Sequence, residues 1–163
     1  MNTFGLLGCY AILYKILDEN IEEITSMFNK NFIFISSLFL LSGATGSIAA
    51  LADVLFPSAS FIEGFIADFD RTSEVLTRLR ILHPMVATGL SVALIIESRK
   101  IQKDYKIDVK FFQILVFIAV ILGVLNVLSN ILLLLSILHL AIADLLWITY
   151  IYVSMDKIKI NHQ

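Results

Sequence analysis

Charged residues are scarce in this chain, and those present are unevenly spread. Asp, Glu, Lys and Arg together make up 16% of the 163 residues, whereas a soluble domain usually carries about a quarter. They lie between long apolar blocks, and 58% of all residues are hydrophobic. This composition excludes an ordinary water-soluble domain and predicts a chain that crosses a lipid bilayer several times.

Cysteine is nearly absent, and so are several sequence signals that would define other classes of protein. The one cysteine, Cys9, forms neither an internal disulfide bond nor a cysteine-based metal cluster. The formal net charge is -2, and no basic stripe with interleaved aromatic residues is present to bind nucleic acid. Residues 4–17 are apolar, but no small-residue cleavage site follows them, so they do not resemble a cleavable signal peptide.

Four apolar stretches are long enough to cross a membrane, since about 20 apolar residues span the hydrocarbon core. They lie at about residues 32–56, 73–97, 111–128 and 131–155. The predicted fold class is therefore an all-α polytopic membrane four-helix bundle over residues 32–156, followed by a short tail at 157–163. The apolar or amphipathic segment 1–31 adds an N-terminal helix, and the sequence leaves open whether that helix is inserted in the membrane or interfacial.

The Lys and Arg residues predict the orientation of the bundle. The connection "SRKIQKDYKIDVK" between the second and third stretches holds five of them, and the C-terminal tail holds Lys157 and Lys159. Because short basic loops stay on the cytoplasmic side, we expect this connection and the C-terminus in the cytoplasm. The chain is then a multi-pass protein of the cell membrane, with residues 57–80 on the outer side.

Two histidines are expected at similar depth in the outer half of the bundle. His83 lies about 15 Å along its helix from Ser73, and His139 lies about 12 Å below the outer end of the last helix, at 1.5 Å per residue. Two imidazoles on different helices can hold one iron between them, as helical bundles do for haem. The alternative is that each histidine only forms a hydrogen bond to a neighbouring helix.

Small and basic residues near these histidines fit a flat, anionic cofactor. The stretch "SGATGS", which includes Thr45 and Gly46, allows close approach of a macrocycle or of another helix. Arg80 lies one turn outward from His83 on nearly the same face, where it can pair with a haem propionate. Arg78 is turned away by about 140° and is the weaker candidate. Both arginines can instead extend towards the outer headgroups.

Two further residues stand out in the spanning stretches. Pro84 has no N–H to donate to the carbonyl of Arg80, so we expect the helix to bend there. Asp144 is an acid near the middle of the last stretch, where ionisable residues are costly and often functional. It is expected either to take part in proton transfer or to accept a hydrogen bond from Asn126, Ser42 or Thr45.

The chain resembles the haem A synthase family. The resemblance is carried by "SGATGSIAALADVLFPSASFIEGFIADFD", "RLRILHPMVA", "LGVLNVL" and "LHLAIADLLW", which together cover about residues 40–155. It implies stepwise oxidation of a methyl group of haem O to the formyl group of haem A, by an oxidoreductase with His83 and His139 as axial ligands. Longer members of the family contain two four-helix halves, and this chain resembles one half-unit, either a second half or a short archaeal-type member.

The chain departs from the family pattern at two points. Arg80 occupies the position where the catalytic half carries a glutamate, and residues 57–80 lack the cysteine pair of many members. Two hypotheses follow: a haem A synthase working as a homodimer or with another half-unit, or a b-type cytochrome half-unit that binds haem b for structural or electron-transfer purposes. A membrane protein with purely structural histidines is a third. No catalytic residue is assigned.

Overall fold

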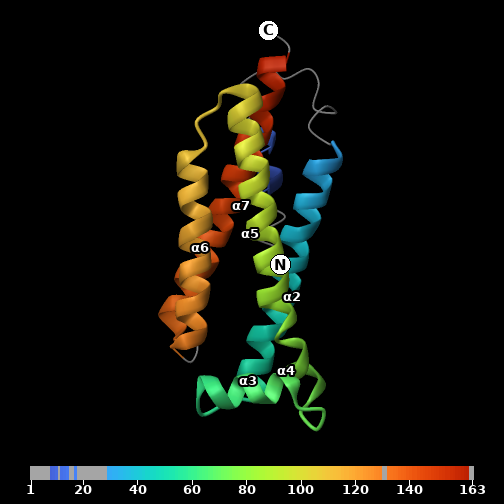
Figure 1. The fold of residues 1–163 in the computed structure, drawn as a ribbon, viewed down its shortest axis with the longest axis vertical. Helices are drawn as coiled ribbons and strands as arrows, with labels where there is room; N and C mark the ends of the chain where they lie inside the picture. Colours follow the sequence, from blue (N-terminus) through green and yellow to red (C-terminus); the bar gives the residue numbers. More distant parts are fainter. Residues whose placement is uncertain (1–7, 11, 15–16, 18–28, 130–131, 162–163) are drawn as a thin grey trace.

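The computed structural model describes residues 8–10, 12–14, 17, 29–129 and 132–161. Its named helices are α2 (Lys30–Leu55), α3 (Phe61–Phe69), α4 (Val75–Leu79), α5 (Leu82–Tyr105), α6 (Lys110–Leu128) and α7 (Leu133–Asn161). The described N-terminal residues 8–10, 12–14 and 17 are also helical, and the described part of the chain contains no strand. The predicted all-α bundle is therefore confirmed (Figure 1).

Four segments are long and apolar enough to cross a membrane, as the sequence predicts. They are Lys30–Leu55, Val75–Tyr105, Lys110–Leu128 and Leu133–Ser154. The second segment begins two residues later than expected, because Asp70 accepts hydrogen bonds from the amide and hydroxyl of Thr72, both at 2.8 Å, and closes a turn. At its other end it extends past the expected residue 97 to Tyr105.

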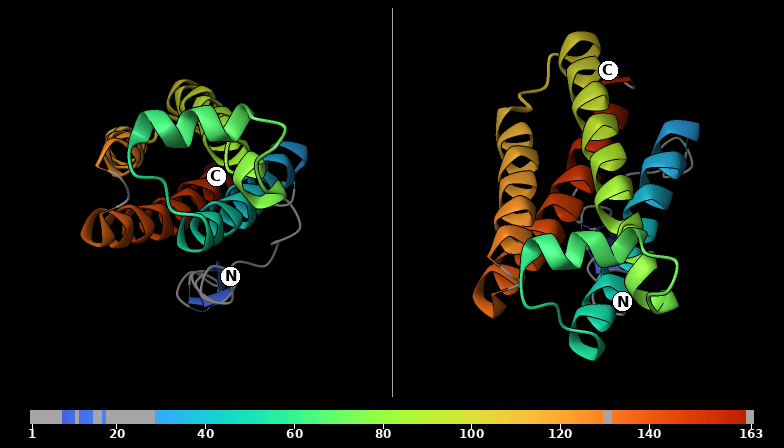
Figure 2. Two further views of the ribbon diagram at one scale, coloured as in Figure 1. Left: turned by 90° about the horizontal axis from the view of Figure 1, so that it is seen from below. Right: turned by 60° about the horizontal axis from the view of Figure 1, so that its bottom comes forward.

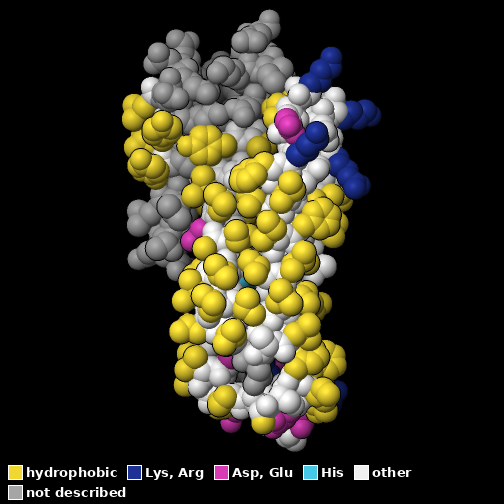
Figure 3. Space-filling view, turned by 90° about the vertical axis from the view of Figure 1, so that its left-hand side faces the viewer, with side chains coloured by type: hydrophobic (Ala, Val, Ile, Leu, Met, Phe, Trp, Pro, Cys, Tyr) yellow, Lys and Arg dark blue, Asp and Glu magenta, His cyan; other side chains and the backbone are white. Residues whose placement is uncertain are grey.

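The four spanning segments pack as two close pairs. Helix α2 lies mainly against α5, and α6 lies mainly against α7, whereas contacts between the pairs are fewer. Helices α3 and α4 are at the same end of the bundle as the α6–α7 connection, and α3 runs across that end (Figures 1 and 2). Lys and Arg side chains gather at the opposite end, and hydrophobic side chains cover the flank between the two (Figure 3).

Helix α3 lies in the connection between the first two spanning segments, where we expect a loop from the sequence. Ser60 caps its N-terminus by accepting from the amide of Glu63 at 3.2 Å, and Glu63 accepts from the amide of Ala59 at 2.8 Å. A serine followed three residues later by a glutamate is the signature of a capping box. This signature, applied to "SFIE", is the signal that predicts the helix.

The second spanning segment is interrupted between α4 and α5, close to the expected bend. Pro84 is the third residue of α5, within the first helical turn, where a missing N–H costs little. The carbonyl of Arg80 accepts from the N–H of His83 at 3.2 Å instead. The tighter turn places Arg80 just outside the start of α5 and His83 just inside it.

The buried apolar core occupies the inner part of the bundle, towards the end where the basic residues gather. It includes Phe32 and Phe39 of α2, Leu94 of α5, Phe112 of α6 and Tyr150 of α7. The aromatic rings of Phe39 and Tyr150 lie 5.8 Å apart, and those of Phe112 and Tyr150 lie 6.3 Å apart. This cluster joins all four spanning helices at one end and includes neither histidine.

Shortening Leu94 to alanine tests this core. Leu94 is fully buried, whereas Ile96 on the same helix is 64% exposed and serves as the matched control. A side chain that leaves this core enters lipid and not water, so the hydrophobic part of the usual cost is missing. We therefore expect Leu94→Ala to lower the free energy of unfolding by about 2 kcal/mol, near the lower end of the usual range. Unfolding of the purified protein in mixed micelles measures it. An equal effect of Ile96→Ala would contradict the assigned core.

Candidate functional site

His83 of α5 and His139 of α7 face one another across the two helix pairs. Their ring centroids lie 6.5 Å apart, and the ring planes are inclined by 80°. The separation is too large for a direct hydrogen bond between the rings, and no such bond joins these two described residues. Because a metal–imidazole bond is about 2 Å long, the space between the rings has the scale of one metal ion bound by both.

The backbone of α2 orients the imidazole of His83. Its Nδ1 lies 3.1 Å from the carbonyl oxygen of Ser42 and 3.5 Å from Oγ1 of Thr45. A carbonyl oxygen only accepts, so Nδ1 carries the proton and Nε2 keeps its lone pair. This is the usual arrangement of a metal-binding histidine, in which the nitrogen that does not bind the metal donates to a nearby oxygen.

The imidazole of His139 lies beside the backbone of Ala119 on α6. Its Nδ1 is buried and has no hydrogen bond of good geometry within the described structure. A buried polar atom without a partner is costly, by about 1–3 kcal/mol. A small rotation of the ring towards Ala119 would remove that cost, whereas a metal bound at Nε2 would leave Nδ1 unchanged.

Two glycines leave room for the imidazoles. A methyl group added at Gly46 on α2 would lie 3.1 Å from Cε1 of His83, and one added at Gly123 on α6 would lie 3.2 Å from Cε1 of His139. Gly46 was singled out from the sequence, but Gly123 was not. Gly123 is the one glycine within α6, a helix of large aliphatic and aromatic residues, and an isolated glycine in such a helix indicates close packing.

The guanidinium of Arg80 is directed towards α2 and α3 and is not free to contact a ligand of His83. Its guanidinium donates to Asp53 of α2 at 2.6 Å, to Asp68 of α3 at 2.7 and 2.8 Å, and to the carbonyl oxygen of Gly64 at 2.9 Å. We call Arg80, Asp53 and Asp68 the outer clamp. The expected contact with a propionate would compete with these bonds. Arg78 is exposed, as its position on the helix predicts.

The other expected polar contacts differ from the structure. Among the described residues, no hydrogen bond joins Asp144 to Ser42, Thr45 or Asn126. The side-chain oxygen of Asn126 instead accepts from the hydroxyl of Ser136 at 3.0 Å and ties α6 to α7. The hydroxyl of Thr45 lies 2.9 and 3.1 Å from the carbonyl oxygens of Leu41 and Ser42 on its own helix.

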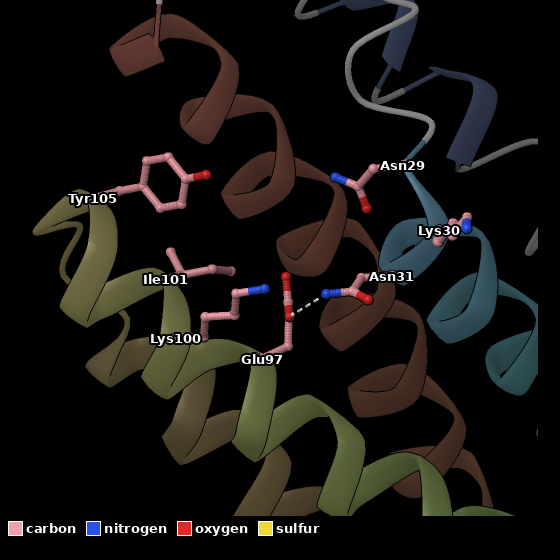
Figure 4. A pocket seen from close by; sticks show the side chains of 7 residues that line it. All are labelled: Asn29, Lys30, Asn31, Glu97, Lys100, Ile101 and Tyr105. Atoms are coloured by element: carbon pink, nitrogen blue, oxygen red, sulfur yellow. Dashed lines mark hydrogen bonds between the residues drawn. The ribbon is translucent and has the colours of Figure 1, made fainter.

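A polar pocket of about 270 Å³ lies at the opposite end of the bundle, between the start of α2 and the end of α5 (Figure 4). Its lining is Asn29, Lys30, Asn31, Glu97, Lys100, Ile101 and Tyr105. The side-chain amide of Asn31 donates to Glu97 at 3.4 Å. Fourteen residues of helix separate His83 from Glu97, which is about 21 Å. This pocket is therefore separate from the histidine site.

The described residues contain no group of three or more His, Cys, Asp or Glu side chains arranged to hold a metal. The histidine pair thus supplies two ligands only. Structural metal sites in proteins usually supply four. Two facing imidazoles therefore suit a metal that brings its other ligands with it, as haem iron does. These features define a multi-pass helical membrane protein with a pair of facing histidines as its candidate functional centre.

The comparison with known families identifies the family. The model of the COX15-CtaA family, described as cytochrome oxidase assembly protein, matches residues 4–151. The chain belongs to this family, which confirms the resemblance noted from the sequence.

Two curated relatives are also similar to the chain. Both are called protoheme IX farnesyltransferase, and they come from two strains of Thermus thermophilus. Each is 25% identical over 133 residues, which are 78% of this chain and 22% of the relative. The chain therefore spans less than a quarter of these relatives. No solved structure matches it.

Replacing Gly46 by alanine tests the close approach of α2 to His83. Alanine stabilises a regular helix over glycine by about 0.5–1 kcal/mol. That gain should appear at Gly43, where an added methyl group meets nothing within 4 Å, and should be absent or reversed at Gly46. Unfolding of the two variants in micelles makes the comparison. Equal stabilisation by both would show that His83 does not pack on Gly46.

Proposed function

We propose that this chain holds a haem iron between His83 and His139 and takes part in oxidising haem O to haem A. The observation that carries the proposal is the facing pair of imidazoles, 6.5 Å apart, on two helices from different close pairs. The proton on Nδ1 of His83 leaves Nε2 free to bind iron, and the ring of His139 lies opposite it with no hydrogen bond between these two described rings.

The surroundings of the pair support a flat macrocycle. Gly46 and Gly123 keep side chains away from the two rings, and Thr45 turns its hydroxyl towards its own helix and His83. The packed apolar core lies at the other end of the bundle. The outer half is thus where this chain would accommodate a cofactor, with haem b or haem O as the bound form.

The residues of the chain would bind and orient, while the haem supplies the redox-active iron. The carbonyl of Ser42 fixes the tautomer and direction of the His83 ring, as second partners of metal ligands commonly do. The reaction is the one that the family resemblance implies, conversion of a methyl to a formyl group with water as the oxygen source.

The names of the relatives also support a haem ligand. A protoheme IX farnesyltransferase handles protoheme IX, and a segment of two such proteins is similar to this chain. The chain supplies one four-helix unit. We propose that it works in the cell membrane as a homodimer or paired with another half-unit.

Pigment analysis of membranes supplied with haem B and haem O tests the function. We expect haem A in extracts of the wild-type protein and none with His83→Ala. Purified His83→Ala and His139→Ala should each lose haem affinity by about tenfold or more, because changes to the outer partners of a ligand alone cost about 10–100-fold. His162→Ala, outside the described residues, is the control and should keep its haem.

Each other result has a distinct meaning. Haem B alone in the wild-type extract would favour the b-type cytochrome half-unit over the synthase. A colourless wild-type protein would contradict haem binding altogether. Full haem retention by both histidine variants would show that the ligands lie elsewhere.

Thiol labelling tests the proposed orientation. In a Cys9→Ser background, Arg71→Cys reports on the α3–α4 connection and Lys103→Cys on the basic end of α5, and both positions are exposed. Because Lys and Arg favour the cytoplasmic side, a membrane-impermeant maleimide should label residue 71 in intact cells and residue 103 only after permeabilisation. The reverse pattern would invert the topology.

A further inference from the structure

The outer clamp contains more negative than positive charge. One guanidinium contacts two carboxylates, and the side chains are only 11% exposed at Arg80, 17% at Asp53 and 12% at Asp68. The contacts of 2.6 to 2.8 Å between guanidinium nitrogens and carboxylate oxygens are those of charge-assisted hydrogen bonds. With both carboxylates ionised, the clamp carries one uncompensated negative charge.

This charge is held in a fixed place by two helices and by the turn between α4 and α5. Asp53 comes from α2 and Asp68 from α3, while Arg80 lies between α4 and α5. The remaining contact of the guanidinium, to the carbonyl oxygen of Gly64, fixes α3 a second time. Since the guanidinium contacts residues of two separate helices, the carboxylates cannot turn away without breaking bonds between elements.

The clamp lies next to the histidine pair. Arg80 and His83 are three residues apart, a rise of about 4.5 Å, and the carbonyl of Arg80 accepts the N–H of His83 at 3.2 Å. Asp53 lies seven residues along α2 from Gly46, which contacts the ring of His83, and this is a rise of about 10.5 Å. Over such a distance a partly buried charge still acts, because salt screens it less than it screens an exposed charge. A metal ion bound by His83 would therefore lie within its field.

We propose that Asp53 and Asp68 of the outer clamp stabilise the oxidised, more positive state of the iron held by His83 and His139, with Arg80 as the residue that positions them. This inference rests on the proposed function. It gives the two aspartates an electrostatic role without contact with the iron. It also means that the propionates of a bound haem are not neutralised by Arg80, whose donors face Asp53, Asp68 and Gly64.

Spectroelectrochemistry of the purified protein loaded with haemin tests this role. Asp53→Asn and Asp68→Asn each remove one negative charge while keeping a side-chain oxygen that accepts from Arg80. Each should raise the midpoint potential of the haem. The low-spin absorption spectrum of a two-histidine haem should stay unchanged, which separates a charge effect from loss of the site.

Asp70→Asn is the matched control. Asp70 follows α3, is fully exposed and does not contact Arg80. Hydrogen bonds from the amide and hydroxyl of Thr72 hold the pKa of Asp70 below its usual range, so this variant also removes a full charge at neutral pH. We expect no shift in its potential.

The outcomes separate this inference from the proposed function. If the wild-type protein binds haem and the Asp53 and Asp68 variants have the potential of Asp70→Asn, the electrostatic role is wrong and the haem site stands. If the wild type binds no low-spin haem, the proposed function and this inference both fail. Should Asp53→Asn not fold, Asp68→Asn alone decides the matter, because either carboxylate carries the same predicted shift.

Discussion

The histidine site depends on the missing N–H of Pro84. Without that donor the second spanning segment does not run as one regular helix, and the carbonyl of Arg80 accepts from His83 instead. The interruption leaves Arg80 just outside α5, within reach of α2 and α3, and leaves His83 in its first turn. From there the ring of His83 meets the carbonyl of Ser42 and faces His139. In a continuous helix, Arg80 and His83 would both lie within regular helical turns.

The apolar core and the histidine pair lie towards opposite ends of the bundle. At the end where Lys and Arg gather, aromatic and aliphatic side chains from all four spanning helices pack into one core. Towards the α3 end, polar contacts join the helices: the clamp of Arg80, the bond from His83 to Ser42, and the bond between Asn126 and Ser136. Polar contacts of this kind are satisfied inside the protein because lipid offers them no partner. The packed end can hold the helices together while the polar end accommodates a ligand.

Helical spacing in the sequence was enough to place the main elements. The length and apolarity of four stretches predict the four spanning segments. A fixed rise per residue predicts that His83 and His139 lie at similar depth. The partners of Arg80 were out of reach of that reasoning, since Asp68 is 12 and Asp53 is 27 residues away in the chain, on other helices. The approach of Asp68 also depends on α3, a helix within the connection between the first two spanning segments. Gly123 was missed because its neighbour His139 belongs to the next helix.

The pairing of the helices has a consequence for biogenesis. His83 belongs to the α2–α5 pair and His139 to the α6–α7 pair, so neither pair contains a complete site. The last spanning helix must leave the ribosome, enter the membrane and dock against the earlier pair before the two imidazoles can meet. The meeting of the two imidazoles is then necessarily a late event, and so is the loading of the haem that we propose. A chain truncated before α7 would insert as a membrane protein but lack His139.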